Sequence, residues 1–138
     1  MAGLARISMS LDAALLEQFD RLAARQGYPT RSEAVKALIR GALVERQWQE
    51  GREVAGAVAL VYDHHRGGAV RKLMDVQHDF GALIVSAQHV HLDDHNCLEL
   101  VVVRGRAARI RELLSRLRSV KGVKHSELVM ATAGAARA

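Results

Sequence analysis

The sequence predicts an α+β protein in which a short strand and two helices precede a larger domain of four strands and two helices. Three observations support this prediction. Polar and apolar residues alternate strictly over residues 6–11, as in a strand with one buried face. Apolar residues then recur at helical spacing through residue 43. From residue 54 onward, apolar runs alternate with amphipathic stretches, which predicts strands interleaved with helices.

The stretch 48–54 separates these two patterns. It has no apolar periodicity and contains Gly51, so we place the domain boundary there. The predicted domains are residues 1–50 and residues 51–138.

The composition is that of a globular protein, with 49% hydrophobic and 25% charged residues. No run approaches the roughly 20 apolar residues of a membrane span, and the first ten residues lack the core of a secretory signal. A single cysteine excludes an internal disulfide. We therefore expect a cytoplasmic protein without a membrane partner. The net charge of +5 permits a polyanionic partner, but the charge balance is +1 for residues 1–50 and +4 for residues 51–138.

Within the first domain, the alternation over residues 6–11 places one apolar and one polar face on the strand. The apolar face carries Ile7, Met9 and Leu11, and the polar face carries Arg6, Ser8 and Ser10. Asp12 is suited to cap the first helix and Gly27 to end it. Thr30 and Glu33 have the capping-box spacing that opens a second helix. The helices are expected to bury two stripes, Leu15, Leu16, Phe19, Leu22 and Ala23 on the first and Ala34, Leu38, Ile39, Ala42 and Leu43 on the second.

The predicted strand has no partner within its own domain. Because an unpaired strand exposes backbone donors and acceptors, it favours pairing with a second copy of the chain. Two copies would form an antiparallel ribbon over four helices, and these residues resemble the ribbon-helix-helix family. The resemblance implies that the ribbon enters the major groove of double-stranded DNA, where Arg6, Ser8 and Ser10 contact bases. The start of the second helix, at Thr30, Arg31 and Ser32, would hold a phosphate. The alternatives are a solvated edge strand and a dimerisation module without DNA.

The second domain has the predicted order βαββαβ, which is the ferredoxin-like arrangement shared by ACT-type regulatory domains. Strands are predicted over residues 54–64, 82–92, 97–104 and 123–131, and helices over residues 70–78 and 107–120. Fold alone does not define function, which depends on particular side chains.

Six of the seven histidines lie between His64 and His95, and Cys97 follows two residues later. His89 and His91 share one face of a predicted strand, and the turn over residues 93–96 returns Cys97 beside them. Thiolate and imidazole ligands favour transition metals over calcium or magnesium. Tetrahedral geometry would indicate zinc, and planar geometry would indicate Ni(II) or Cu(II). His78 is the candidate fourth ligand, from the same or a neighbouring subunit.

Three short stretches resemble the metal-binding signature of the NikR family in order and spacing. They are residues 76–78, residues 89–91 and residues 96–99. The resemblance implies square-planar Ni(II), one per subunit, bound by His89, His91 and Cys97 of one subunit and His78 of another. It places Gln77 and Glu99 where their hydrogen bonds orient the ligands. It also places Tyr62 and His64 near the metal, where they help to bind other metals.

The resemblance implies a nickel-dependent DNA-binding transcriptional regulator, not an enzyme, that represses nickel uptake genes. It further implies a homotetramer built as a dimer of dimers on a palindromic operator. A regulator of cobalt, copper or zinc, and an antitoxin-like ribbon-helix-helix protein, are the alternatives. A metalloenzyme is disfavoured because no general base stands beside the ligands. A second cation site that the family builds near Glu33 is not expected here, because its acidic partner is replaced by Ala37.

Overall fold

The computed structural model describes residues 3–134, which form two compact units divided between Gly41 and Ala42. The division lies inside α2 (Arg31–Gln49), so the last turns of this helix belong to the second unit. The stretch 48–54 contains the end of α2 and a turn in which Gly51 adopts a φ of 70°. No helix in the described residues is long and apolar enough to cross a membrane.

The first unit contains α1 (Ala13–Arg25) and the beginning of α2. The predicted caps are confirmed. The Asp12 carboxylate accepts the Leu15 amide at 2.8 Å, and the Thr30 hydroxyl accepts the Glu33 amide at 3.1 Å. Gly27, just beyond α1, adopts a φ of 79°, which favours glycine over residues with a Cβ.

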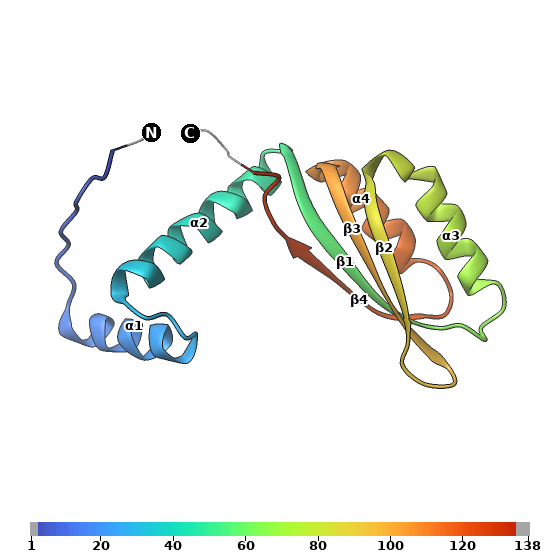
Figure 1. Cartoon of the computed structure of the whole chain (residues 1–138), viewed down its shortest axis with the longest axis horizontal. Coiled ribbons are helices and arrows are strands. Elements are labelled where there is room, and N and C mark those ends of the chain that lie inside the picture. Colours follow the sequence, from blue (N-terminus) through green and yellow to red (C-terminus); the bar gives the residue numbers. More distant parts are fainter. Residues whose placement is uncertain (1–2, 135–138) are drawn as a thin grey trace. The chain divides into compact units, whose positions relative to one another are not determined.

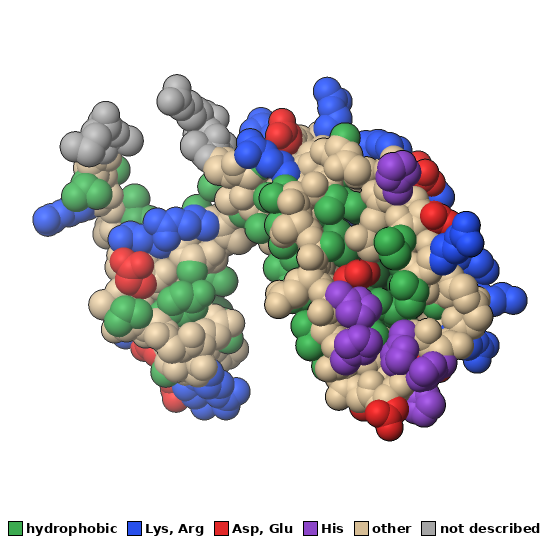
Figure 2. Space-filling view, turned by 45° about the vertical axis from the view of Figure 1, so that its right-hand side comes forward, with side chains coloured by type: hydrophobic (Ala, Val, Ile, Leu, Met, Phe, Trp, Pro, Cys, Tyr) green, Lys and Arg blue, Asp and Glu red, His purple; other side chains and the backbone are tan. Residues whose placement is uncertain are grey.

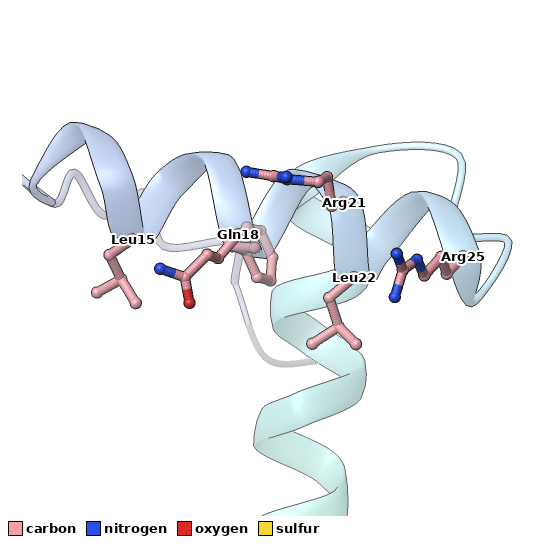
Figure 3. Close-up of a pocket in the computed structure, with 6 residues that line it drawn as sticks. Leu15, Gln18, Arg21, Leu22 and Arg25 are labelled. Carbon is pink, nitrogen blue, oxygen red and sulfur yellow. The ribbon is translucent and has the colours of Figure 1, made fainter.

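The strand predicted over residues 6–11 is not formed in the single chain, because residues 3–12 have no neighbouring strand with which to pair. Most residues of the two predicted helix stripes are not buried within the single chain, and their expected burial against a second copy stays a prediction. Leu38 and Ile39 are each 51% exposed, whereas Ala23 and Ala34 are buried. Leu15 and Leu22 line a shallow depression on α1 and point to the same side of the helix (Figure 3). The first unit thus exposes a largely apolar surface.

The second unit is a four-stranded antiparallel sheet with the order β2-β3-β1-β4. Its elements are β1 (Glu53–Asp63), α3 (Ala69–Asp79), a 3-10 turn (Gly81–Leu83), β2 (Ile84–His91), β3 (Asn96–Arg106), α4 (Ala107–Arg118) and β4 (Val123–Met130). The ferredoxin-like order is therefore confirmed. Helices α3 and α4 cover one face of the sheet (Figure 1). Burial alternates along β1, so every second side chain faces the helices.

The end of α2 is anchored in the core of the second unit. Trp48 is 2% exposed, and its indole N–H donates to the Ala131 carbonyl at 2.9 Å. The Trp48 ring lies over Gly56 of β1, and a Cβ at Gly56 would fall 3.1 Å from the ring and 2.5 Å from the Val129 carbonyl oxygen. Gly56 therefore allows the close approach of β4 and the tryptophan.

Gly56→Ala is expected to lower the free energy of unfolding by about 1–3 kcal/mol, because the added methyl overpacks a fixed backbone contact. Urea unfolding followed by tryptophan fluorescence measures this effect on the second unit. Gly81→Ala is the matched control, because nothing lies within 4 Å of its added Cβ. Equal stability of the two variants would contradict the packing described here.

Candidate metal centre and DNA-binding segment

The ends of three strands bring the candidate ligands together. In the sheet register, Tyr62 of β1 and His91 of β2 both pair with Cys97 of β3. The turn between β2 and β3 is held by Asp93, whose carboxylate accepts the amides of His95 and Asn96 at 2.8 and 2.7 Å. The hydrogen bonds from Asn96 and from the backbone lower the pKa of Asp93 to about 2. This tight turn fixes where Cys97 begins its strand.

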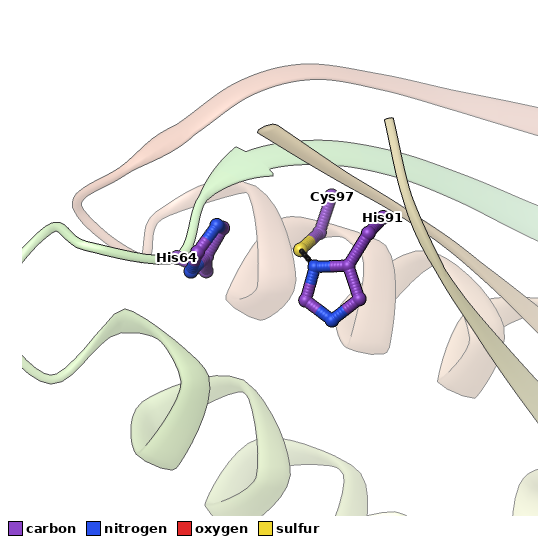
Figure 4. A group of neighbouring side chains, drawn as sticks. All are labelled: His64, His91 and Cys97. Atoms are coloured by element: carbon purple, nitrogen blue, oxygen red, sulfur yellow. Dashed lines mark hydrogen bonds between the residues drawn. The ribbon is translucent and has the colours of Figure 1, made fainter. Parts of the chain in front are cut away.

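His64, His91 and Cys97 form the inner group (Figure 4), in which the potential ligand atoms all lie within 4.8 Å of one another. Cys97 Sγ lies 3.4 Å from His91 Nδ1, and the thiol is fully buried. His64 Nε2 is buried and has no hydrogen-bond partner within residues 3–134. Because a buried polar atom normally has a partner, a metal ion would satisfy this nitrogen. Two imidazoles and a thiol are a donor set that transition metals accept.

His89 lies beside His91 of the inner group and is held in place by the Tyr62 hydroxyl. Its ring centroid is 5.1 Å from that of His91, and its Nδ1 is 2.9 Å from the Tyr62 hydroxyl. Burial is the main reason that the pKa of Tyr62 rises to about 12, so this side chain remains a neutral phenol. When His89 Nδ1–H donates to Tyr62, the Nε2 atom is left free for a metal.

Two further polar residues orient this edge of the group. Glu99 Oε1 lies 3.8 Å from His89 Nδ1, and Gln77 of α3 donates to Glu99 Oε2 at 2.8 Å. The carboxylate is thus placed between a histidine of β2 and an amide of α3. Such contacts fix the tautomer and the rotation of a ligating imidazole.

The thiol environment makes ionisation difficult without a metal. Burial, followed by the negative charges of Glu99, Asp93 and Asp63, raises the pKa of Cys97. We expect the thiolate absorbance of the metal-free chain to appear only above the ordinary thiol range. Because a metal must displace the thiol proton, nickel affinity should rise with pH through neutrality. An ultraviolet pH titration of metal-free protein measures the first effect, and a thiolate signal at neutral pH would contradict it.

The remaining histidines lie outside the inner group. His78 is exposed on α3, and within the single chain it does not join His64, His91 and Cys97. His95 is exposed in the turn between β2 and β3. Residue spacing alone did not predict that His64 lies beside Cys97. The register of β1 against β3 accounts for it, because Tyr62 pairs with Cys97 and His64 follows two residues later.

The residues expected to contact DNA lie in the first unit. Arg6, Ser8 and Ser10 are exposed in the segment 3–12. Arg31, at the start of α2, makes two 2.8 Å hydrogen bonds to Asp20 of α1. This ion pair joins the two helices and engages the guanidinium group.

Both units match known protein families. Residues 5–46 match the ribbon-helix-helix protein, copG family, and residues 55–131 match the NikR C-terminal nickel-binding domain. An uncharacterized protein from Thermotoga maritima shares the fold of the second unit, with a TM-score of 0.53 at 18% identity. That match covers 57% of this chain and 98% of the other.

Several relatives named as nickel-responsive regulators span nearly the whole chain. The relative from Pyrococcus abyssi is 50% identical over 95% of this chain and 96% of its own length. The relative from Thermococcus onnurineus is 51% identical over 94% of each chain. The relative from Chlorobium limicola is 47% identical over 97% of this chain and its own full length. These names describe regulators rather than enzymes. With an exposed segment of alternating polar and apolar residues before two capped helices, and an imidazole–thiol group in a ferredoxin-like unit, the chain belongs to the NikR family of nickel-responsive, ribbon-helix-helix regulators.

Proposed function

We propose that this chain binds operator DNA in response to Ni(II) and represses nickel uptake genes in the cytoplasm. The observation that carries the proposal is the closeness of three proposed ligands, because His91 Nδ1 lies 3.4 Å from the buried Cys97 Sγ and the rings of His89 and His91 are 5.1 Å apart. Cobalt, copper and zinc accept similar donors, so the choice of nickel rests on the family rather than on the donor set.

The proposed nickel ligands are His89, His91 and Cys97 of one subunit and His78 of a second subunit, with one ion per chain. The position of His78 supports this assignment, because the residue is exposed on α3 and available to another copy. Tyr62, Gln77 and Glu99 would orient the ligands through the contacts described above. His64 would then complete the site for metals that prefer a different geometry.

The proposed assembly is a dimer of dimers. In the first unit, a ribbon formed by residues 6–11 of two chains would cover the exposed leucines of α1 and α2 and Ile39 of α2. In the second unit, Val85 of β2 and Val129 of β4 are 65% and 60% exposed, which offers an apolar surface for further copies. Two-fold symmetry of each dimer predicts a palindromic operator.

The proposed mechanism is a shift between arrangements of the assembly. Metal held by residues of two subunits stabilises only those arrangements in which the subunits are correctly placed, and DNA selects among the same arrangements. By linkage, nickel should raise operator affinity by the factor by which DNA raises nickel affinity.

Arg6→Ala is expected to cost about 1–3 kcal/mol of operator binding for each arginine removed and to relax the preference at one base position in each half-site. The physical reason is the bidentate bond that arginine gives to guanine in the major groove. Fluorescence anisotropy with operator variants measures both effects. Equal weakening on all sequences would assign Arg6 to a phosphate instead.

The operator itself can be obtained by selecting binders from random duplex DNA with the nickel-loaded full chain. The proposal predicts enrichment of a palindrome whose half-sites are separated by whole helical turns. The same selection with Arg6→Ala should lose information at symmetric positions in both half-sites. Recovery of no common sequence would overturn the regulatory proposal.

A further inference from the structure

The positive charge of the chain is concentrated on α4 and the end of β3. Residues 104–118 contain six arginines, no lysine and a single acidic residue, which gives this segment a formal charge of +5. The whole chain also carries +5, because fourteen basic and fourteen acidic residues balance one another outside the segment. All six arginines are exposed. Figure 2 shows histidine side chains gathered on one face of the second unit, with lysine and arginine side chains along its margin.

Four of these arginines form two rows on the outer surface of α4. The side of the helix that faces the sheet is marked by its buried apolar residues, from Ala107 to Leu117. At 3.6 residues per turn, Arg109 and Arg116 lie on one flank of this buried side, and Arg111 and Arg118 lie on the other flank. The two arginines of each row are separated by about two helical turns, or roughly 10.5 Å along the axis. We call these four residues the arginine face.

One row is held over a buried aromatic ring. The Cζ atoms of Arg109 and Arg116 lie 4.6 and 5.4 Å from the ring centroid of Phe80, which is 3% exposed. The same two guanidinium groups form ion pairs with Glu112 and Asp79. These contacts fix the position of the row and neutralise part of its charge.

The other row is positioned by neutral groups. Arg111 Cζ lies 5.8 Å from the ring centroid of Trp48, and Arg118 Nε donates to the Ser126 hydroxyl at 2.7 Å. Within residues 3–134, no carboxylate forms an ion pair with Arg111 or Arg118. The charge of this row is therefore available to an external anion.

The chemistry of the arginine face favours phosphate groups that follow one another along a polymer. Guanidinium groups match the geometry of phosphate oxygens. Duplex DNA carries one charge per roughly 1.7 Å of its axis, so rows of this length meet several phosphates whatever the base sequence. Between the rows, Ala108 and Ser115 have short side chains that allow a close approach. A lipid surface is a poor partner, because the apolar side of α4 is buried against the sheet and cannot insert.

We propose that the arginine face of α4 binds the phosphate backbone of duplex DNA without reading its sequence. This goes beyond the operator binding proposed above, because it gives the second unit a DNA contact that requires neither the ribbon nor nickel. The distribution of charge supports the proposal, since residues 1–50 carry a balance of only +1. Contacts with phosphates supply affinity for any duplex, whereas contacts with bases distinguish the operator.

The test is fluorescence anisotropy of the full chain with a labelled duplex of scrambled sequence at salt concentrations of roughly 50–200 mM. The variant combines Arg111→Gln with Arg118→Gln, because removing these two arginines leaves no carboxylate without its ion pair. Each lost phosphate contact should make the slope of log affinity against log salt shallower by about 0.9, or about 1.8 for each arginine face that engages DNA. Affinity for the selected operator should fall by the same factor as affinity for the scrambled duplex.

The matched control combines Arg111→Lys with Arg118→Lys, which keeps both charges and should keep the salt slope of the wild type. An unchanged slope in the glutamine variant would overturn the proposal. Equal losses in the lysine and glutamine variants would also overturn it, because altered packing of α4 would then explain both. If the glutamine variant kept its DNA affinity but lost binding of poly-glutamate, the arginine face would instead bind an acidic protein.

The same measurements separate this proposal from the operator function. Equal wild-type affinity for the operator and the scrambled duplex would contradict operator recognition, while the slopes of the two variants would still decide the role of α4. Failure of the wild type to bind the scrambled duplex at the lowest salt concentration would overturn the role of α4 and leave operator recognition standing.

Discussion

Cys97→Ser is expected to abolish the near-ultraviolet absorption band that Ni(II) produces with the wild-type chain. Nickel affinity should fall by more than about 100-fold, since even residues that only orient a ligand contribute roughly 10–100-fold. The reason is that Cys97 supplies the soft donor of the group and lies 3.4 Å from His91 Nδ1 in a fully buried position. Titration of metal-free protein with nickel chloride, followed by absorbance, measures both quantities.

Two histidine variants sharpen this prediction. His78→Gln should weaken nickel binding and lower the cooperativity of nickel binding between chains, because the proposed nickel site spans two subunits. His64→Gln should leave the nickel band in place but weaken binding of zinc, because His64 joins His91 and Cys97 within one chain. The reverse pattern would reassign the nickel site to His64, His91 and Cys97. A band that survives Cys97→Ser would remove the thiol from the site altogether.

Leu38→Glu should prevent the first unit from folding as a dimer and should abolish DNA binding. Leu38 is 51% exposed in the single chain, and its neighbours Ile39 and Leu43 are similarly exposed. Burying a leucine contributes about 1.5–3 kcal/mol to stability. Because a two-fold interface contains the same residue from both chains, the substitution should lower the stability of the dimer by about 3–6 kcal/mol. Thermal unfolding followed by circular dichroism at several chain concentrations measures the effect.

The control is Leu4→Glu, which makes the same change at a fully exposed side chain in the N-terminal segment. It should leave the unfolding transition of the helices in place. If Leu38→Glu were neutral or stabilising, the exposed stripe of α2 would not be an interface, and the ribbon-helix-helix dimer proposed here would be wrong.

The sequence predicted the second unit well because its elements are specified locally. β1, α3, β2, β3, α4 and β4 all follow from hydrophobic period, glycine positions and turn residues. The β2–β3 hairpin is an example. The turn that Asp93 stabilises sets the register in which His91 lies opposite Cys97. Local turn chemistry was therefore sufficient to bring a histidine and the cysteine together.

Features that depend on distant segments or on another chain could not be obtained in this way. The strand at residues 6–11 needs a partner that the single chain does not provide, and the apolar stripe of α2 stays exposed for the same reason. His64 is brought to Cys97 by the register of β1 against β3, which no local pattern specifies. Trp48, at the expected boundary, is instead buried in the core of the second unit.

Fluorescence anisotropy of a labelled, selected operator, with metal-free and with nickel-loaded full chain, measures whether Ni(II) controls DNA binding. We expect one Ni(II) per chain to raise operator affinity at least about fivefold, the lower end of typical coupling between sites. Cys97→Ser should remove the increase while retaining the metal-free affinity. Operator affinity that does not change over a wide range of nickel concentration would show that DNA binding is not nickel-dependent.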